Sequence, residues 1–291
     1  SLMKLIQFWR NGAPALGIQT AHGLVDAAAE ATRRGMTVPG DMASLIPLGP
    51  EGASRLLAPL AEDPVCLLDP EVISPAPVVT SPGRILCIGL NYRQHARECN
   101  LPLPSAPVLF NKFSNALAAH GEEITLPKDY EEYDYEAELV AVIGKPAREV
   151  PQESALDYVF GYTCGNDLST RDLQFARGNQ WLLSKTFDGF APVGPCLVTA
   201  DSLDPNHLDI SSTVNGKLRQ SSNTSDMIFP LAQIIADLSH HFTLLPGDLI
   251  FTGTPQGVMQ GYPADRKQWL KPGDRVEVTI QGIGTLSNSL R

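Results

Sequence analysis

Three acidic side chains alternate in the stretch YDYEAELVAVIGK, residues 133–145: Asp134, Glu136 and Glu138. In an extended chain alternate residues project from one face, where like charges repel and a half-buried carboxylate needs a positive partner. Glu136 and Glu138 would form a pincer for a hard divalent cation such as Mg²⁺, Mn²⁺ or Ca²⁺. Asp134 shares this face but need not be a ligand. The alternative is a solvated face of an edge strand.

Two further motifs carry groups that suit a catalytic site. In GYTCGNDLSTRDLQ, Asp167 follows Gly165 and Asn166, and a sharp turn at glycine can direct a short carboxylate towards a neighbouring strand. In RILCIGLNYRQHAREC, His95 and Glu98 are three residues apart and would share one face of a helical turn. A carboxylate beside an imidazole orients it and raises its basicity, which suits activation of water. A surface ion pair is the alternative.

Two more polar residues have apolar or glycine-rich neighbours. Lys185, in QWLLSKTFDGFAPVGP, can meet an anionic substrate, and a snorkelling surface lysine is the alternative. Thr254, in IFTGTPQGV, follows a strand and lies in a turn whose N–H groups and hydroxyl can hold a carboxylate. This turn lacks the GxxxxGK[ST] spacing, which excludes a nucleotide P-loop.

The composition limits the classes of partner. The chain has 291 residues, of which 43% are hydrophobic and 19% are charged, as in ordinary globular proteins. A formal net charge of −10 argues against nucleic acid or an anionic membrane as the main partner. No apolar run approaches the roughly 20 residues that a membrane span needs. The first residues, SLMKLIQFWR, lack the pattern of a secretion signal.

The five cysteines are odd in number, widely spaced and without a CxxC pair. This pattern predicts neither a disulfide framework nor a zinc site, and it favours a reduced cytoplasmic protein. Cys164, beside the acidic GND segment, is the one cysteine placed to suggest a nucleophile. We favour the alternative, a small buried thiol.

A proline-rich stretch at residues 69–83, DPEVISPAPVVTSPG, predicts a linker. We expect a small N-terminal α/β domain at residues 1–75 and a catalytic domain at 76–291. The N-terminal part has strand patterns at KLIQFW and LGIQTAHGLVD and helical patterns around 26–35 and 51–61. It contains no residues that suggest chemistry.

The remainder of the chain is dominated by short β-type runs separated by Gly and Pro. These runs are RILCIGL, VLFNKF, ELVAVIG, GPCLVT, LDISSTVNG, DLIFTGT and DRVEVTIQGIGTL. One helix is clear, in SDMIFPLAQIIADLSHHF, where Ser225 or Asp226 can act as N-cap and Pro230 lies near the first turn. Many strands and few helices predict an α+β, β-rich fold with a mixed β roll.

Together, and in this order, the motifs strongly resemble the fumarylacetoacetate hydrolase family over about residues 82–290. The matching stretches are IGLNYRQHARE, YDYEAELVAVIGK, FGYTCGNDLSTRDLQ, QWLLSKTFDGFAPVGP, LLPGDLIFTGTPQGV, LKPGDRVEV and GIGTLSNSL. The resemblance implies a β-rich roll that usually forms a homodimer.

The resemblance also implies a metal site, in which Glu136, Glu138 and Asp167 bind Mg²⁺ or Mn²⁺. Enzymes of the tyrosine-breakdown branch carry an additional acidic ligand after the Asn-Tyr of the first motif. This chain has Arg93 and Gln94 there instead, so that ligand is not expected.

The catalytic groups implied by the resemblance are the dyad His95 and Glu98, on a short lid that orders over bound ligand, and the active-site lysine Lys185. Met259 and the insert GYPADRKQW, which follow the GTPQGV motif, can border the pocket. The substrate contacts implied by the RDxQ and GTPxGV motifs come from Arg171, Gln174 and Thr254.

The form of the motifs favours the branch of acylpyruvate hydrolases, oxaloacetate decarboxylases or tautomerases, and hydroxymuconate isomerases. These enzymes imply a small-molecule 2-oxo acid substrate that chelates the metal, with Lys185 and Arg171 offsetting excess negative charge. We expect hydrolysis of a C–C bond, with water activated by the dyad. The alternatives are an isomerase, a tautomerase, a decarboxylase or a ureidoglycolate lyase. A non-catalytic metal-binding protein is disfavoured because it needs no dyad.

Overall fold

The computed structural model describes residues 2–291, and its largest element is a mixed sheet of 12 strands. Ten of these strands form one continuous path. In spatial order they are β4 (Leu67–Leu68), β3 (Gly23–Asp26), β2 (Ala13–Thr20), β1 (Lys4–Arg10), β13 (Ala191–Thr199), β11 (Val159–Asn166), β10 (Ala137–Ile143), β16 (Leu249–Phe251), β6 (Ile85–Gly89) and β7 (Val108–Lys112). Off this path, β5 (Pro75–Ala76) pairs with β1, and β8 (Leu117–Ala119) pairs with β13.

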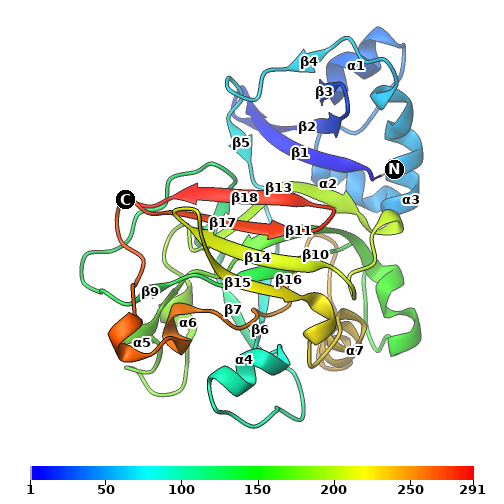
Figure 1. The fold of residues 1–291 in the computed structure, drawn as a ribbon. Helices are drawn as coiled ribbons and strands as arrows, with labels where there is room; N and C mark the ends of the chain where they lie inside the picture. The colour runs from blue at the N-terminus through cyan, green and yellow to red at the C-terminus, as the bar shows by residue number, and fades with distance from the viewer. Residues whose placement is uncertain (1) are drawn as a thin grey trace.

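The other strands form a sheet of four and a pair. The sheet of four has the order β15 (Lys217–Asn223), β14 (Asp209–Val214), β17 (Arg275–Ile280) and β18 (Gly284–Ser289), and the pair is β9 (Tyr133–Asp134) with β12 (Ser169–Thr170). The α-helices are α1 (Ala27–Arg33), α2 (Met42–Leu45), α3 (Gly49–Leu57), α4 (Arg93–Glu98), α5 (Arg171–Gln174), α6 (Leu182–Lys185) and α7 (Leu231–His241). The three N-terminal helices form a lobe above the body, while α4 to α7 lie at its opposite side (Figure 1). The predicted α+β, β-rich fold is confirmed.

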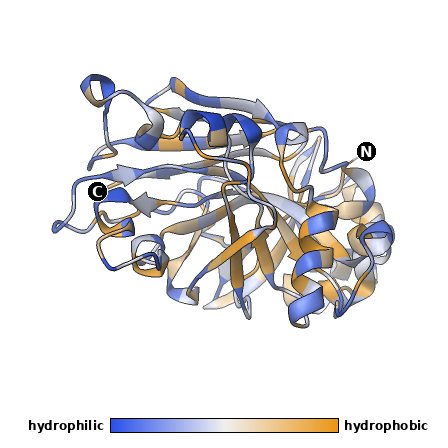
Figure 2. Cartoon of the chain, turned by 90° about the horizontal axis from the view of Figure 1, so that it is seen from below, coloured by the Kyte–Doolittle hydropathy of each residue, from blue (hydrophilic) through white to orange (hydrophobic). Residues whose placement is uncertain are grey.

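Strand β10 separates the two large hydrophobic cores. Leu139, Ala141 and Ile143 face the core that contains α7 and the inner side of the four-stranded sheet, whereas Val140 and Val142 face the core of the N-terminal helices. All seven residues of the strand are buried, since both of its faces are covered. Hydrophobic strands accordingly cross the middle of the molecule in Figure 2. A carboxylate on such a strand must therefore find its partner inside the protein.

The N-terminal lobe shares its sheet with the body. Strand β1 pairs with β13 in antiparallel register, with Lys4 opposite Val198. Within the predicted linker, β5 pairs with β1 at Gln7 and Phe8. The division at residues 75 and 76 stays a prediction. The lobe has its own helices, but its strands extend the central sheet.

Several predicted elements differ in detail from the structure. Helix α7 begins at Leu231, directly after Pro230, whereas Ser225 and Asp226 lie in a separate short 3₁₀ helix and do not cap it. The N-cap prediction was wrong because the extended Pro230 occupies the N-cap position of α7, and the 3₁₀ turn ends before it, at Asp226. The single run DRVEVTIQGIGTL forms the hairpin β17–β18.

Strand β11 was absent from the predicted strands. Its sequence, VFGYTCGN, contains two glycines and a terminal asparagine, which normally disfavour a strand. In the structure every residue of β11 is buried between β10 and β13, and added Cβ atoms at Gly161 and Gly165 would lie within 2.6 Å of neighbouring atoms. Close packing therefore requires glycine here.

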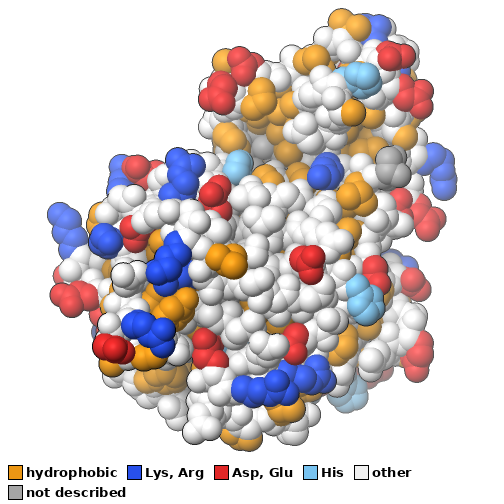
Figure 3. Space-filling model, viewed as in Figure 1, with side chains coloured by type: hydrophobic (Ala, Val, Ile, Leu, Met, Phe, Trp, Pro, Cys, Tyr) orange, Lys and Arg blue, Asp and Glu red, His pale blue; other side chains and the backbone are white. Residues whose placement is uncertain are grey.

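The surface carries mixed charge. On the face shown in Figure 3, acidic and basic side chains are interspersed, without one large region of a single sign. None of the helices in residues 2–291 has the length and apolar character that crossing a membrane would take.

Candidate active site

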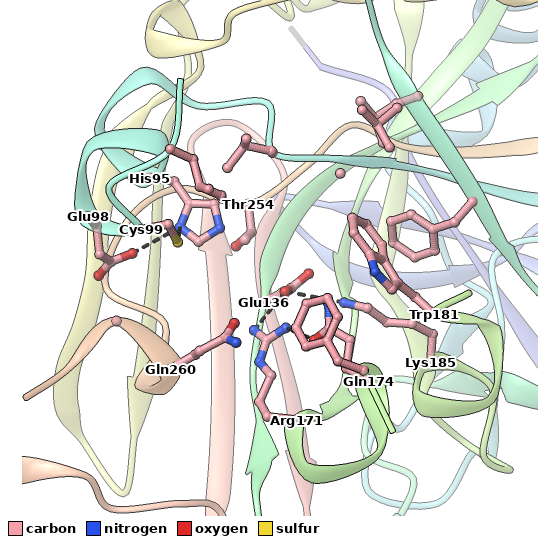
Figure 4. Close-up of a pocket in the computed structure, with 18 residues that line it drawn as sticks. His95, Glu98, Cys99, Glu136, Arg171, Gln174, Trp181, Lys185, Thr254 and Gln260 are labelled. Atoms are coloured by element: carbon pink, nitrogen blue, oxygen red, sulfur yellow. Dashed lines mark hydrogen bonds and ion pairs between the residues drawn. The ribbon is translucent and has the colours of Figure 1, made fainter. Parts of the chain in front are cut away.

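A cavity of about 580 Å³ opens between α4, α5 and α6 and the ends of the central strands. Seven of the nine predicted site residues line it, and Figure 4 shows their side chains around it. These seven are His95, Glu98, Glu136, Arg171, Gln174, Lys185 and Thr254. The other two, Glu138 and Asp167, lie fully buried beside Glu136. The structure thus brings all nine together.

The pairing of β10 with β11 assembles the three carboxylates. Glu138 lies opposite Gly165, and the segment that follows β11 turns back so that the Asp167 N–H donates to the Glu136 carbonyl at 2.9 Å. The Asn166 side chain accepts from the Glu136 N–H at 3.0 Å. One oxygen from each of Glu136, Glu138 and Asp167 lies within 4.8 Å of the others.

These carboxylates fit a hard divalent cation. Ligand oxygens on opposite sides of an ion with bonds of about 2.1 Å lie about 4.2 Å apart, which is compatible with the observed cluster. The buried Oδ2 of Asp167 accepts no hydrogen bond. Burial, together with Asp167 and Glu136, raises the pKa of the Glu138 carboxyl well above its ordinary value. An ionised Glu138 is therefore unfavourable unless a further cation lies beside it.

Three buried cationic side chains contact Glu136 and Asp167 and offset their negative charge. Arg171 contacts Glu136 at 2.8 Å, and Lys185 Nζ lies 3.3 Å from Glu136 and 3.6 Å from Asp167. Burial raises the pKa of Glu136, but Lys185 and Arg171 more than offset it, so the net shift is downward. The third cation, Lys112, lies 2.6 Å from Asp167 Oδ1.

Sequence reasoning missed Lys112. The pattern VLFNKF predicts only a strand, and a lysine at its end ordinarily reaches solvent. In the structure its side chain is buried and its Nζ donates to the carbonyls of Leu168, Lys185 and Phe190 at 3.0, 2.5 and 2.8 Å. Lys112 therefore joins the segments that carry Asp167 and Lys185, in addition to neutralising Asp167.

Asp134, in β9, has different partners from Glu136 and Glu138. Its carboxylate accepts from Arg171 Nε at 3.0 Å and from the N–H groups of Met259 and Gln260 at 2.8 and 2.9 Å. It lies outside the cluster of three carboxylates. Asp134 thus holds Arg171 against Glu136 and fixes the segment after GTPQGV, of which Gln260 and Gly261 line the cavity.

The His–Glu dyad is formed by the single helix α4. His95 Nδ1 and Glu98 Oε2 are 2.9 Å apart, and Glu98 Oε1 accepts from the Gly257 N–H at 2.9 Å. An added Cβ at Gly261 would lie 2.2 Å from Glu98, so only glycine leaves room for this carboxylate. Arg93, at the position where the other branch has a metal ligand, donates instead to the Met227 carbonyl at 2.7 Å. These contacts hold the dyad at the cavity wall.

Two of the side chains predicted to contact substrate already make hydrogen bonds within the protein. Gln174 Oε1 accepts from Arg171 at 3.0 Å, and the Thr254 hydroxyl donates to the Ala137 carbonyl at 2.9 Å and accepts from Gln220 at 2.8 Å. Both side chains still face the cavity, so their substrate contacts stay predictions. The remaining cavity wall is largely apolar and is formed by Ile88, Leu90, Leu101, Val108, Phe110, Phe175 and Trp181.

The predicted alternative of a nucleophilic cysteine finds no support in the geometry. Cys164 is fully buried in the core that contains α7, and burial raises the pKa of its thiol. All five cysteines are free.

The β-rich fold thus carries a cavity lined by an imidazole–carboxylate pair, next to a buried cluster of three carboxylates that could hold a metal ion. The chain belongs to the fumarylacetoacetate hydrolase family: the family profile described as fumarylacetoacetate (FAA) hydrolase C-terminal matches residues 84–291. The chain is 40% identical over 294 residues to the oxaloacetate tautomerase FAHD2B, mitochondrial, of Bos taurus, covering 99% of this chain and 91% of that protein.

Solved structures agree with this assignment. A fumarylacetoacetate hydrolase from Exiguobacterium antarcticum superposes with a TM-score of 0.82 at 31% identity, over 99% of both chains. A fumarylpyruvate hydrolase from Pseudomonas aeruginosa, in complex with Mn²⁺ and pyruvate, superposes with a TM-score of 0.65 at 37% identity, over 75% of this chain and 91% of that one. The protein is thus an enzyme of a family that includes hydrolases and tautomerases.

The metal assignment predicts the effect of Glu138→Gln. Glutamine keeps an oxygen for the Gly253 N–H, which donates to Glu138 at 2.8 Å, but it removes a ligand charge. We expect Mn²⁺ affinity, measured by calorimetry, to fall by about 100-fold, because even outer partners of metal ligands contribute about 10–100-fold. Exposed Glu131→Gln is the control and should bind normally. Unchanged affinity in Glu138→Gln would remove this residue from the metal site.

Proposed function

We propose that this protein is a divalent-metal-dependent enzyme that moves a proton within a 2-oxo acid and interconverts the keto and enol forms of oxaloacetate. The observation that carries the proposal is the full-length similarity to an oxaloacetate tautomerase, including the N-terminal lobe. The site supports it, since the His95–Glu98 pair lines the same cavity as Glu136, a member of the cluster that fits a cation. Mg²⁺ and Mn²⁺ are both compatible with oxygen ligands.

Each group in the cavity has a task in this reaction. A cation at Glu136, Glu138 and Asp167 would act as a Lewis acid on the 2-oxo acid and favour its enolate. His95 removes the proton from the carbon beside the 2-oxo group, and Glu98 orients the imidazole and stabilises its charged form. Lys185, which also donates to Ser169 at 2.7 Å, offers positive charge to the anionic substrate. Arg171 holds Glu136 in place.

The pH dependence of kcat/KM for the keto form of the substrate should report the protonation of His95. Burial lowers the pKa of His95, but its contacts with Cys99 and Glu98 raise it to about 9. The neutral ring accepts the proton, so kcat/KM for keto-to-enol conversion should rise with pH towards that value. In Glu98→Gln the pKa falls and the rise should move to lower pH, with a lower plateau. A rise at unchanged pH would show that Glu98 does not act through His95.

A second candidate is hydrolysis of a C–C bond in an acylpyruvate, which the motifs favour. The observation in its support is the apolar wall of Val108, Phe110, Phe175 and Trp181. A four-carbon diacid would leave much of the 580 Å³ cavity unfilled, whereas an acyl chain would bury against these side chains. His95 would then take a proton from water instead of carbon. Decarboxylation, hydroxymuconate isomerisation and ureidoglycolate cleavage rank below these two.

The deciding experiment is turnover of oxaloacetate, acylpyruvates and a hydroxymuconate analogue, each with Mg²⁺, with Mn²⁺ and after EDTA. Metal-dependent enol–keto exchange of oxaloacetate without cleavage supports the tautomerase. Cleavage of acylpyruvates at higher kcat/KM supports the hydrolase. No turnover of any substrate, with metal bound normally, would contradict both and favour a binding protein.

We also propose a homodimer that forms through the β7 edge of the sheet. Strand β7 ends the sheet order, and the apolar side chains of Leu101, Leu103, Leu109 and Phe113 are exposed near it. An open apolar edge commonly pairs with a second chain. Sedimentation equilibrium should give twice the chain mass of 31.4 kDa, and a monomer at micromolar concentration would contradict this. The cytoplasmic location stays a prediction, since the cattle relative is named as mitochondrial.

A further inference from the structure

The dyad has a third neighbour that the proposed reaction does not use. Cys99 directly follows α4, and its Sγ lies 3.9 Å from His95 Nδ1. One ligand atom from each of His95, Glu98 and Cys99 lies within 4.8 Å of the others. The three residues occupy positions i, i+3 and i+4 and therefore share one face of the helix.

We propose that His95, Glu98 and Cys99 form a second metal site, which takes a soft divalent cation of the zinc type and switches the enzyme off. An imidazole, a carboxylate and a thiolate are the ligands that zinc selects, whereas Mg²⁺ avoids sulfur. The absence of a CxxC pair argued against zinc, but this site needs only one cysteine. It is separate from the carboxylate cluster, which offers oxygen alone.

The distances suit zinc after small side-chain movements. With Zn–N bonds of about 2.0–2.1 Å and a Zn–S bond of about 2.3 Å, tetrahedral ligand atoms lie about 3.3–3.6 Å apart. The observed separations are 2.9 Å between His95 and Glu98 and 3.9 Å between His95 and Cys99. Glu98 is already oriented, because its Oε1 accepts from the Gly257 N–H and leaves Oε2 towards the histidine.

The site is accessible and nearly neutral when filled. All three residues line the cavity, so an ion can enter by the substrate route. A cation of charge +2 is matched by the Glu98 carboxylate and by the Cys99 thiolate, whose proton passes to solvent. Three protein ligands with one open position resemble the arrangement of an exchangeable zinc ion more than that of a closed structural site.

Zinc here would block the proton transfer. His95 Nδ1 would bind the metal and lose its contact with Glu98, and the other ring nitrogen would then carry the proton. A ring in this state cannot accept a proton from substrate. In Figure 4 the imidazole lies between Glu98 and Thr254. We therefore expect inhibition that Mg²⁺ at the carboxylate cluster does not prevent.

The test uses the full chain with saturating Mg²⁺ and measures binding without turnover. Co²⁺ should give the near-ultraviolet thiolate-to-cobalt absorption, which the carboxylate cluster cannot produce, and Zn²⁺ should abolish it. In Cys99→Ser the absorption should vanish, and Zn²⁺ affinity, from competition with a chromogenic chelator, should fall by at least about tenfold. Cys66→Ser, at another partly buried free cysteine, should keep both.

Two outcomes would overturn the proposal: no thiolate absorption in the unaltered protein, or equal Zn²⁺ affinity in the protein and in Cys99→Ser. Inhibition by Zn²⁺ is measured separately, relative to the rate of each protein without Zn²⁺. Because the absorption needs no substrate, failure of the proposed tautomerase activity would leave the zinc site standing, and failure of the site would leave the activity standing.

Discussion

Replacing His95 by alanine is expected to lower kcat for oxaloacetate by about 10²–10⁴-fold, the range that one positioned general base typically contributes. His95 is held by Glu98 at 2.9 Å and faces a cavity whose opposite side carries Glu136, Arg171 and Lys185. Its removal takes away the proton acceptor and leaves the carboxylate cluster intact. Mn²⁺ affinity should therefore stay within a factor of about two of the unaltered protein, since His95 is not among the predicted ligands.

Stopped-flow absorbance of the enol gives kcat, and calorimetry gives the Mn²⁺ affinity. His240→Ala is the matched control, because His240 is exposed at the end of α7 and should leave both quantities unchanged. A His95→Ala protein that retains most of its kcat would show that another group transfers the proton. A loss of Mn²⁺ affinity in the same variant would show instead that the dyad and the carboxylates act as one site.

The local motifs named side chains that the structure brings together, because each chemical group lies in a short segment whose local geometry is nearly fixed. His95 and Glu98 share a helical turn, so their spacing alone predicts their contact, and it is observed. Glu136 and Glu138 come together in the structure, as their alternation predicts. Strand β10 begins at Ala137, between them, and pairs Glu138 with Gly165. Predicting that these two carboxylates lie close together therefore required no knowledge of distant contacts.

What sequence patterns could not supply were long-range partners. The partner of Asp167 is Lys112, 55 residues earlier in the chain, and no local pattern marks that lysine as buried. Arg171 was expected to meet substrate, but its donors reach Asp134, Glu136 and Gln174. These contacts depend on how β6, β7 and β10 lie in one sheet, which spacing along the chain does not encode.

The same limit applies to the domain organisation. A run of prolines marked a linker, and prolines do terminate many elements. However, Pro75 and Ala76 within it pair with β1, because an edge of that strand was free to accept them. The N-terminal lobe is thus joined to the body by backbone hydrogen bonds along β1 and β13, although its motifs carry no chemistry.

Lys112→Met should have the largest effect on stability. The substitution keeps the length of the side chain but leaves Asp167 and three backbone carbonyls without the ammonium group that now contacts them. Removing one partner of a buried ion pair typically costs about 3–5 kcal/mol, because the remaining charge is uncompensated. We expect the free energy of unfolding in urea, measured without divalent metal, to fall by that amount.

Metal should recover part of this loss. A cation bound to Asp167 supplies the positive charge that the variant lacks, and ligand that binds only the folded state stabilises it. Adding Mg²⁺ or Mn²⁺ should therefore stabilise Lys112→Met more than the unaltered protein. Lys271→Met is the control: its side chain is 76% exposed and lies 4.0 Å from Asp274, so its loss should cost less than about 0.5 kcal/mol.

A double variant separates charge from packing. Lys112→Met combined with Asp167→Asn removes both members of the pair, so its unfolding free energy should exceed that expected from adding the two single losses. Additive losses would mean that Lys112 acts mainly through the carbonyls of Leu168, Lys185 and Phe190. In that case Mg²⁺ would also give no extra stabilisation, because the defect would lie in the backbone that positions Lys185 and not in the charge on Asp167.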